Sequence, residues 1–87
     1  MYTETTNFYG ATLEKTFSFD GVTEMVLKSK KPLNQPQIDC FIWETKKHSE
    51  IDIPLIWCDN ITEIYIDLEG QAIILVINNK IEVEIDY

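Results

Sequence analysis

The chain contains no arginine, and its seven lysines are outnumbered by fifteen aspartates and glutamates, which gives a net charge of −8 at pH 7. Such an excess of negative charge repels the phosphates of nucleic acids and the surfaces of anionic membranes. We therefore expect no direct binding to nucleic acid or membrane. A basic protein is the natural electrostatic complement.

Glycine and cysteine are scarce, and long apolar runs are missing. Gly10, Gly21 and Gly70 are isolated, so there is no glycine-rich phosphate loop. No apolar stretch approaches the length of a membrane span, and the first residues do not resemble a signal peptide. We therefore expect a cytoplasmic protein in which Cys40 and Cys58 remain free thiols, with a disulfide as the alternative for an exported chain.

The only histidine, His48, offers little chemistry. On a strand, His48, Glu50 and Asp52 would share one face and could ligate a divalent metal, but a solvated strand end is the more common meaning of this pattern. Ser49 and His48 would point to opposite faces, so they could not share a proton as a nucleophile and its base. We expect no enzyme, no cofactor and no metal site.

What the sequence does contain is enough apolar material to fold. Apolar residues make up 45% of the 87 residues, and ten of them are aromatic, which excludes a disordered chain despite the charge. A chain of this length forms one domain, spanning residues 1–87, with a small core.

The clearest pattern lies in the C-terminal third, where three segments predict a β-meander: Ile61–Leu68, Ala72–Ile77 and Ile81–Tyr87. The first and third alternate with a period of two, and a helical period would place carboxylates in the apolar stripe. The middle segment is apolar throughout and rich in Ile and Val, which favours a central strand.

The turns of this meander decide which side chains share a face. A two-residue turn at Glu69-Gly70 or at Gly70-Gln71 leaves the apolar side chains of the first two strands together. The last strand joins them only if Asn78-Asn79-Lys80 is a three-residue loop with a bulge, because a one-residue slip would move every side chain to the other face. A second face would then carry Tyr65, Asp67, Ile74, Val76, Glu82, Glu84 and Asp86.

The N-terminal half also alternates. Met1–Thr12 is polar and predicts an edge strand or a frayed terminus. Leu13–Phe19 predicts a strand, Asp20-Gly21 a hairpin turn, and Val22–Lys28 the returning strand. The alternative is a helix over Val22–Lys31, with Asp20 as its N-cap.

The middle of the chain is less regular. Ser29–Gln37 has two prolines and no period, which predicts a loop. Ile38–Glu44 is apolar on both faces of a strand, and Thr45–Ser49 predicts a polar turn. Glu50–Trp57 alternates, but its proline favours an edge strand or a bulge, and Cys58–Asn60 is the turn into the meander.

Both tryptophans lie within apolar runs, which predicts core positions. On the second face of the meander, Ile74 and Val76 need a cover. Either the N-terminal half supplies it through Phe17, Phe19 or Trp43, or another protein does.

These patterns predict a mainly β domain of roughly six or seven antiparallel strands, arranged as a barrel or a two-layer sandwich. An α+β fold with a helix near Val22–Lys31 is the alternative. The expected function is a non-enzymatic acidic protein that inhibits a basic partner: an immunity protein, an antitoxin or a phage-encoded inhibitor, with its carboxylates imitating a nucleic acid. The alternative is a structural module that self-associates through strand edges or through Ile74 and Val76.

Overall fold

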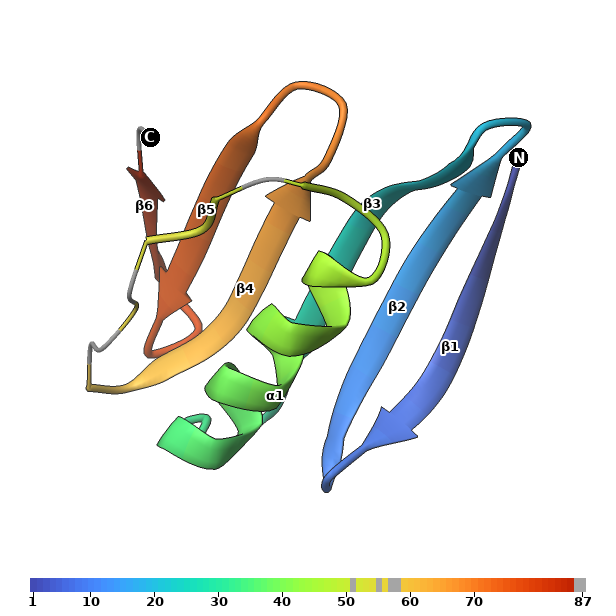
Figure 1. Ribbon diagram of the computed structural model, residues 1–87. Coiled ribbons are helices and arrows are strands. Elements are labelled where there is room, and N and C mark those ends of the chain that lie inside the picture. Colours follow the sequence, from blue (N-terminus) through green and yellow to red (C-terminus); the bar gives the residue numbers. More distant parts are fainter. Residues whose placement is uncertain (51, 55, 57–58, 86–87) are drawn as a thin grey trace.

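The computed structural model describes residues 1–50, 52–54, 56 and 59–85 (Figure 1). These residues form a single antiparallel sheet in which the strands follow one another in sequence order, and the helix α1 is inserted between β3 and β4. The elements are β1 (Tyr2–Phe8), β2 (Ala11–Ser18), β3 (Gly21–Lys28), α1 (Gln35–Lys46), β4 (Ile61–Asp67), β5 (Ala72–Ile77) and β6 (Ile81–Ile85).

The prediction of a mainly β, antiparallel domain is confirmed, with six strands in the described part of the chain. The sheet is open, so the predicted barrel or two-layer sandwich is not the arrangement found. Figure 1 shows that α1 lies across one face of the sheet. The helix packs on the apolar side chains of that face, which a second sheet would otherwise bury.

The helix falls where a buried strand was predicted, at Ile38–Glu44, so that prediction is wrong. Asn34 caps the helix: its side chain accepts a hydrogen bond from the Gln37 backbone N–H at 2.9 Å, and Gln37 Oε1 accepts one from the Asn34 N–H at 2.9 Å. A proline in the first turn is compatible with this start, since its missing N–H has no helical partner there. The buried positions are spaced as one face of a helix, namely Ile38, Phe41 and Thr45.

These helix bounds also correct two neighbouring predictions. The loop predicted over Ser29–Gln37 ends at Asn34, and the turn predicted over Thr45–Ser49 begins two residues later, because the helix continues through Lys46. Cys40 therefore lies on the helix rather than in a strand, and its thiol is free.

The N-terminal half forms two hairpins. The returning strand predicted over Val22–Lys28 is confirmed as β3, and the alternative helix over Val22–Lys31 is wrong. Ser18 faces Gly21 across the hairpin, and Gly21 has a φ of +117°, which a residue with a Cβ rarely adopts. Met1–Thr12 supplies the predicted edge strand, β1, which pairs with β2.

The C-terminal meander is confirmed in its register. Ile77 faces Ile81, so the second loop consists of the three residues Asn78-Asn79-Lys80, as predicted. Both asparagines have positive φ, 53° and 60°, and the Lys80 N–H donates to the Ile77 carbonyl at 3.1 Å. Asparagine tolerates this left-handed conformation better than most residues.

The first loop of the meander has the register of the Glu69-Gly70 alternative but is longer than the predicted two-residue turn. Asp67 faces Ala72, which leaves four residues between the strands. The Asp67 carboxylate accepts hydrogen bonds from the Glu69 and Gly70 N–H groups at 3.0 and 2.9 Å and so closes the turn.

The core lies between α1 and one face of the sheet. One row of this face crosses five strands through Leu13, Leu27, Ile64, Leu75 and Val83. The first four are buried, and Phe41 packs into the same core from the helix. Full burial of a side chain of this size contributes about 1.5–3 kcal/mol.

The segment between α1 and β4 departs from its prediction. The described residues of Glu50–Trp57 form no strand. Trp43, expected in the core, is 70% exposed on the outer side of α1, with the Lys46 ammonium 5.5 Å from its ring centre. The predictions that concern Trp57, Cys58 and Asp86 lie outside the described residues.

Candidate protein-binding face

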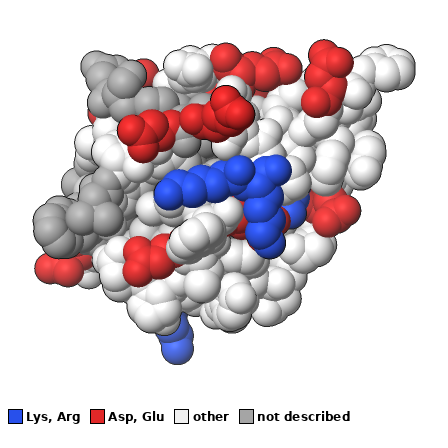
Figure 2. Space-filling view, viewed as in Figure 1, with Lys and Arg blue, Asp and Glu red and all other residues white. Residues whose placement is uncertain are grey.

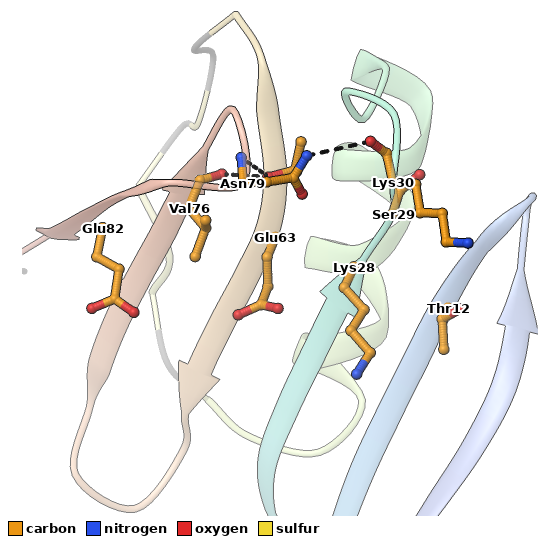
Figure 3. Close-up of a pocket in the computed structure, with 9 residues that line it drawn as sticks. Thr12, Lys28, Ser29, Lys30, Glu63, Val76, Asn79 and Glu82 are labelled. Atoms are coloured by element: carbon orange, nitrogen blue, oxygen red, sulfur yellow. Dashed lines mark hydrogen bonds between the residues drawn. The ribbon is translucent and has the colours of Figure 1, made fainter.

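The sheet has a second face, turned away from α1, which we call the open face. Figure 3 shows it with the helix behind the strands. Because successive side chains of a strand point to opposite faces, the residues opposite one another across the strands form rows on this face. One row is Thr12, Lys28, Glu63, Val76 and Glu82, the next is Glu14, Val26, Tyr65, Ile74 and Glu84, and the third is Thr16, Glu24, Asp67 and Ala72.

The structure brings the predicted partner-binding residues together on the open face. Tyr65 faces Ile74, and Ile74 faces Glu84 on the next strand. In the neighbouring row Val76 faces Glu82. Asp67 lies on the same face at the end of β4, and Asp86 lies outside the described residues. The placement follows the predicted register, while the binding role of these residues stays a prediction.

The face is wider than the sequence indicated, because β3 pairs with β4. Val26 lies beside Tyr65, and Glu24 lies beside Asp67. Val26, Tyr65, Ile74 and Val76 form a continuous strip, half-buried by its neighbours in the sheet, which we call the apolar strip. The alternation of β3 was visible in the sequence, but its pairing with a strand more than thirty residues later was not.

Carboxylates surround the apolar strip. Among the described residues, the three rows of the open face carry six carboxylates and one lysine. The lysine, Lys28, is 3.0 Å from the Glu14 carboxylate. These two charges compensate each other, so the remaining carboxylates have no lysine of the open face as a close partner: Glu24, Glu63, Asp67, Glu82 and Glu84.

None of the aromatic residues considered as a cover reaches this strip. Phe19 is fully exposed in the turn after β2, and Trp43 lies on the helix side. Phe17 shares its face with the buried Leu13, and its ring stacks on Tyr2 with centroids 4.9 Å apart. Within the part of the chain that the structure describes, the strip is covered by no other element.

Tyr65 shows the electrostatic character of the open face. Desolvation, a hydrogen bond to the Glu24 carboxylate and the charges of Glu24 and Asp67 together raise the pKa of Tyr65 to about 12. The phenol therefore stays neutral and donates to a carboxylate. A negative charge at this position is disfavoured, whereas a positive charge brought by a partner is favoured.

A hollow of about 480 Å³ lies at one end of the open face, near the β5–β6 loop (Figure 3). Val76 lies between Glu63 and Glu82 in this hollow. Asn79 fixes the loop beside it, since its backbone N–H donates to the Thr62 hydroxyl at 3.0 Å and its side-chain amide to the Lys30 carbonyl at 3.5 Å. The hollow thus combines an apolar centre and carboxylates with a fixed rim, and Lys28 and Lys30 also line it.

The helix side differs in charge. Figure 2 shows lysine side chains lying across the middle of that side, with carboxylates toward the edges. Glu44 is the acidic centre of this group: Lys15 Nζ is 2.8 Å from Glu44 Oε2 and Lys47 Nζ is 3.2 Å from Oε1. The hydrogen bond from Lys15, more than any other contact, lowers the pKa of Glu44.

His48 follows the helix and lies 3.5 Å from Glu44, instead of sharing a strand face with Glu50 and Asp52 as the metal hypothesis required. The residues that the structure describes contain no group of three His, Cys, Asp or Glu side chains able to hold a metal. Among the same residues, the helix is too short and too polar to cross a membrane.

The fold and the open face together define a small β domain whose open sheet is covered by a helix on one side and presents an acidic surface with an apolar centre on the other. Comparisons with protein-family models, with curated proteins and with solved structures give no match.

Proposed function

We propose that this is a non-enzymatic acidic binding protein whose open face docks on a basic protein and blocks it. The observation that carries the proposal is the uncovered apolar strip with its rim of carboxylates, on a chain with a net charge of −8. Protein interfaces commonly combine an apolar centre with a polar rim. A partner that covered the strip would remove its apolar surface from water.

The carboxylates around the apolar strip indicate what kind of partner would bind there. Neighbouring strands lie about 4.8 Å apart, and the carboxylates of the open face project from β2, β3, β4 and β6. A protein that binds nucleic acid presents lysines and arginines to phosphates, and the same side chains would meet these carboxylates. One suitable partner is a nuclease toxin, for which this protein would be the immunity protein or antitoxin. Another is a host defence enzyme, for which it would be a phage-encoded inhibitor. Either pair would act in the cytoplasm.

Binding to a basic partner should depend on the salt concentration. Long-range attraction between an acidic face and a basic partner raises the association rate and makes it fall with ionic strength, because the Debye length shrinks from about 30 Å at 0.01 M salt to about 10 Å at 0.1 M. The dissociation rate depends more on the close contacts of the apolar strip.

The test begins with pull-downs at low salt and identification of the captured basic protein, followed by stopped-flow association with that purified partner. The Glu82→Lys/Glu84→Lys double variant should slow association by about tenfold or more. Asp39→Lys/Glu50→Lys changes the net charge equally, but away from the open face, and should have a much smaller effect.

If both double variants slow association equally, or if the open-face variant leaves binding intact, the proposed function fails. Light scattering checks the alternative of self-association. A stable homo-oligomer at micromolar concentration would favour the structural module, whereas a monomer is expected here.

A further inference from the structure

The two edges of the sheet are built differently. The middle of β1, from Thr3 to Asn7, is polar on both faces, and Glu4 points to the helix side of the sheet, opposite Lys15. An inward-pointing charge on an edge strand is a known protection against pairing with another chain. β6 has the sequence Ile-Glu-Val-Glu-Ile, with no proline, no lysine and no charge on its helix side. Its outer edge lacks the protection that β1 has.

The helix side of β6 is also incompletely covered. Val83 is the last member of the core row that contains Leu75 and Ile64, yet it is 39% exposed, whereas Leu75 is 4% exposed. Ile81 is 56% exposed on the same side. The core row therefore ends at an apolar side chain that one further strand would cover.

On the open face, β6 presents Glu82 and Glu84 at the outermost position of the acidic rows. A strand added at this edge would place its own side chains directly beside these two carboxylates, where opposite charges stabilise the pairing and like charges destabilise it. A second copy of β6 is a poor occupant. Antiparallel pairing centred on Val83 would set Glu82 against Glu84 of the other copy. Parallel pairing of the same edge would turn the second sheet over, so each glutamate would lie beside an apolar side chain and gain no opposite charge.

We propose that the outer edge of β6 binds an extended segment of the basic partner as a seventh strand, in which basic residues alternate with apolar ones. This proposal rests on the proposed function and specifies how the partner is held. Main-chain hydrogen bonds to this edge, with which no strand of the described residues pairs, supply affinity. The basic side chains meet Glu82 and Glu84 on the open face, and the apolar side chains cover Ile81 and Val83 on the helix side.

Synthetic peptides test the edge directly. The probe is a fluorescent peptide of about seven residues in which valine and lysine alternate, compared with a peptide of the same composition in two blocks and with an alternating peptide N-methylated at every backbone amide. Fluorescence anisotropy should show that the alternating peptide binds at least about tenfold more tightly than either control, because only it can pair its backbone and match both faces.

Two variants locate the peptide. Val83→Lys places a charge on the helix side of β6, as Glu4 does on β1, and should weaken peptide binding by about tenfold or more. Thr5→Lys adds the same charge at the exposed middle of β1 and should leave the affinity within about twofold, since it alters only the net charge.

Equal binding of the alternating and N-methylated peptides, or equal loss in the two variants, would overturn the proposal, because attraction by charge alone explains either result. Ile74→Thr separates this failure from that of the proposed function. It removes apolar surface at the centre of the open face and keeps a β-branched side chain suited to a strand. If it weakens docking of the captured partner while no peptide binds the edge, the seventh strand is refuted and the open-face interface stands.

Discussion

The contact between Lys15 and Glu44 should couple the stability of this protein to pH. The two side chains join β2 to α1 with a distance of 2.8 Å between Lys15 Nζ and Glu44 Oε2, and they are only 16% and 17% exposed. Lys47 adds a second contact to the same carboxylate. Glu44→Gln removes the negative charge and leaves two lysines around a neutral amide.

The magnitude follows from the geometry. At 2.8 Å and an effective dielectric constant of about 20, the gross attraction between Lys15 and Glu44 is about 6 kcal/mol, most of which is offset by desolvation of the two ions. A hydrogen bond to a charged group contributes about 1.5–3 kcal/mol net. Because glutamine still accepts a hydrogen bond, we expect Glu44→Gln to lower the free energy of unfolding by about 1–2 kcal/mol at neutral pH.

The pH dependence has a defined sign. The pKa of Glu44 is lowered from its ordinary value of 4.5, first by the hydrogen bond from Lys15. A lowered pKa in the folded state means that the contribution is complete above the unfolded pKa and is lost as the pH falls through the folded one. The difference between wild type and Glu44→Gln should therefore be constant above about pH 5.5 and shrink below about pH 4.5.

Urea denaturation followed by circular dichroism, from about pH 7 down to about pH 3.5, measures this difference. Glu50→Gln, which removes an exposed carboxylate after the helix, is the matched control and should change stability by less than about 0.5 kcal/mol. A difference between wild type and Glu44→Gln that stays the same across this range would refute the reasoning, as would equal effects of the two variants.

Two further predictions concern the open face and the helix start. Absorbance titration should give Tyr65 a pKa of about 12, and Glu24→Gln should lower it, since that substitution removes the charge and weakens the hydrogen-bond acceptor that hold the proton. If Glu24→Gln left the titration of Tyr65 unchanged, the role given to Glu24 would be refuted. Because the folded-state pKa of Tyr65 is raised, the wild type should also lose stability as the pH rises above about 10. Asn34→Ala should cost about 1 kcal/mol of stability by removing the helix cap, measured by urea denaturation, whereas Asn34→Asp should retain most of it, and equal losses would show that the cap does not contribute.

The segment that forms α1 was predicted as a strand, and its sequence shows why. Five of the seven residues of Ile38–Glu44 are apolar, and such a run fits a buried strand and a helix equally well when its period alone is considered. The capping pattern of Asn34 and Gln37 was present in the sequence and would have favoured the helix. The wrong prediction of a core position for Trp43 has the same origin, because the helical period turns Trp43 outward while Ile38 and Phe41 turn inward.

The sequence predicted the part of the open face that the meander supplies, but not the part that β3 supplies. In the meander, short loops leave few registers, and burial of one face selects among them, so the neighbours of Ile74 and Val76 followed from local sequence. The contribution of Val26 and Glu24 did not, because a helix and a loop separate β3 from β4 in the chain and no local turn sets their register.

The sequence by itself determined the strands of the two hairpin regions, the three-residue loop at Asn78-Asn79-Lys80 and the acidic character of the chain, since these depend on local period, turn residues and composition. Only the tertiary structure decided that α1 covers one face, that β3 joins β4, and that no other element of the described residues covers the strip around Ile74. The physical reason is that these are choices among long-range contacts of similar chemistry. Apolar burial is not directional, so local sequence does not tell which element will cover an apolar surface. That choice depends on how all the elements of the chain pack together.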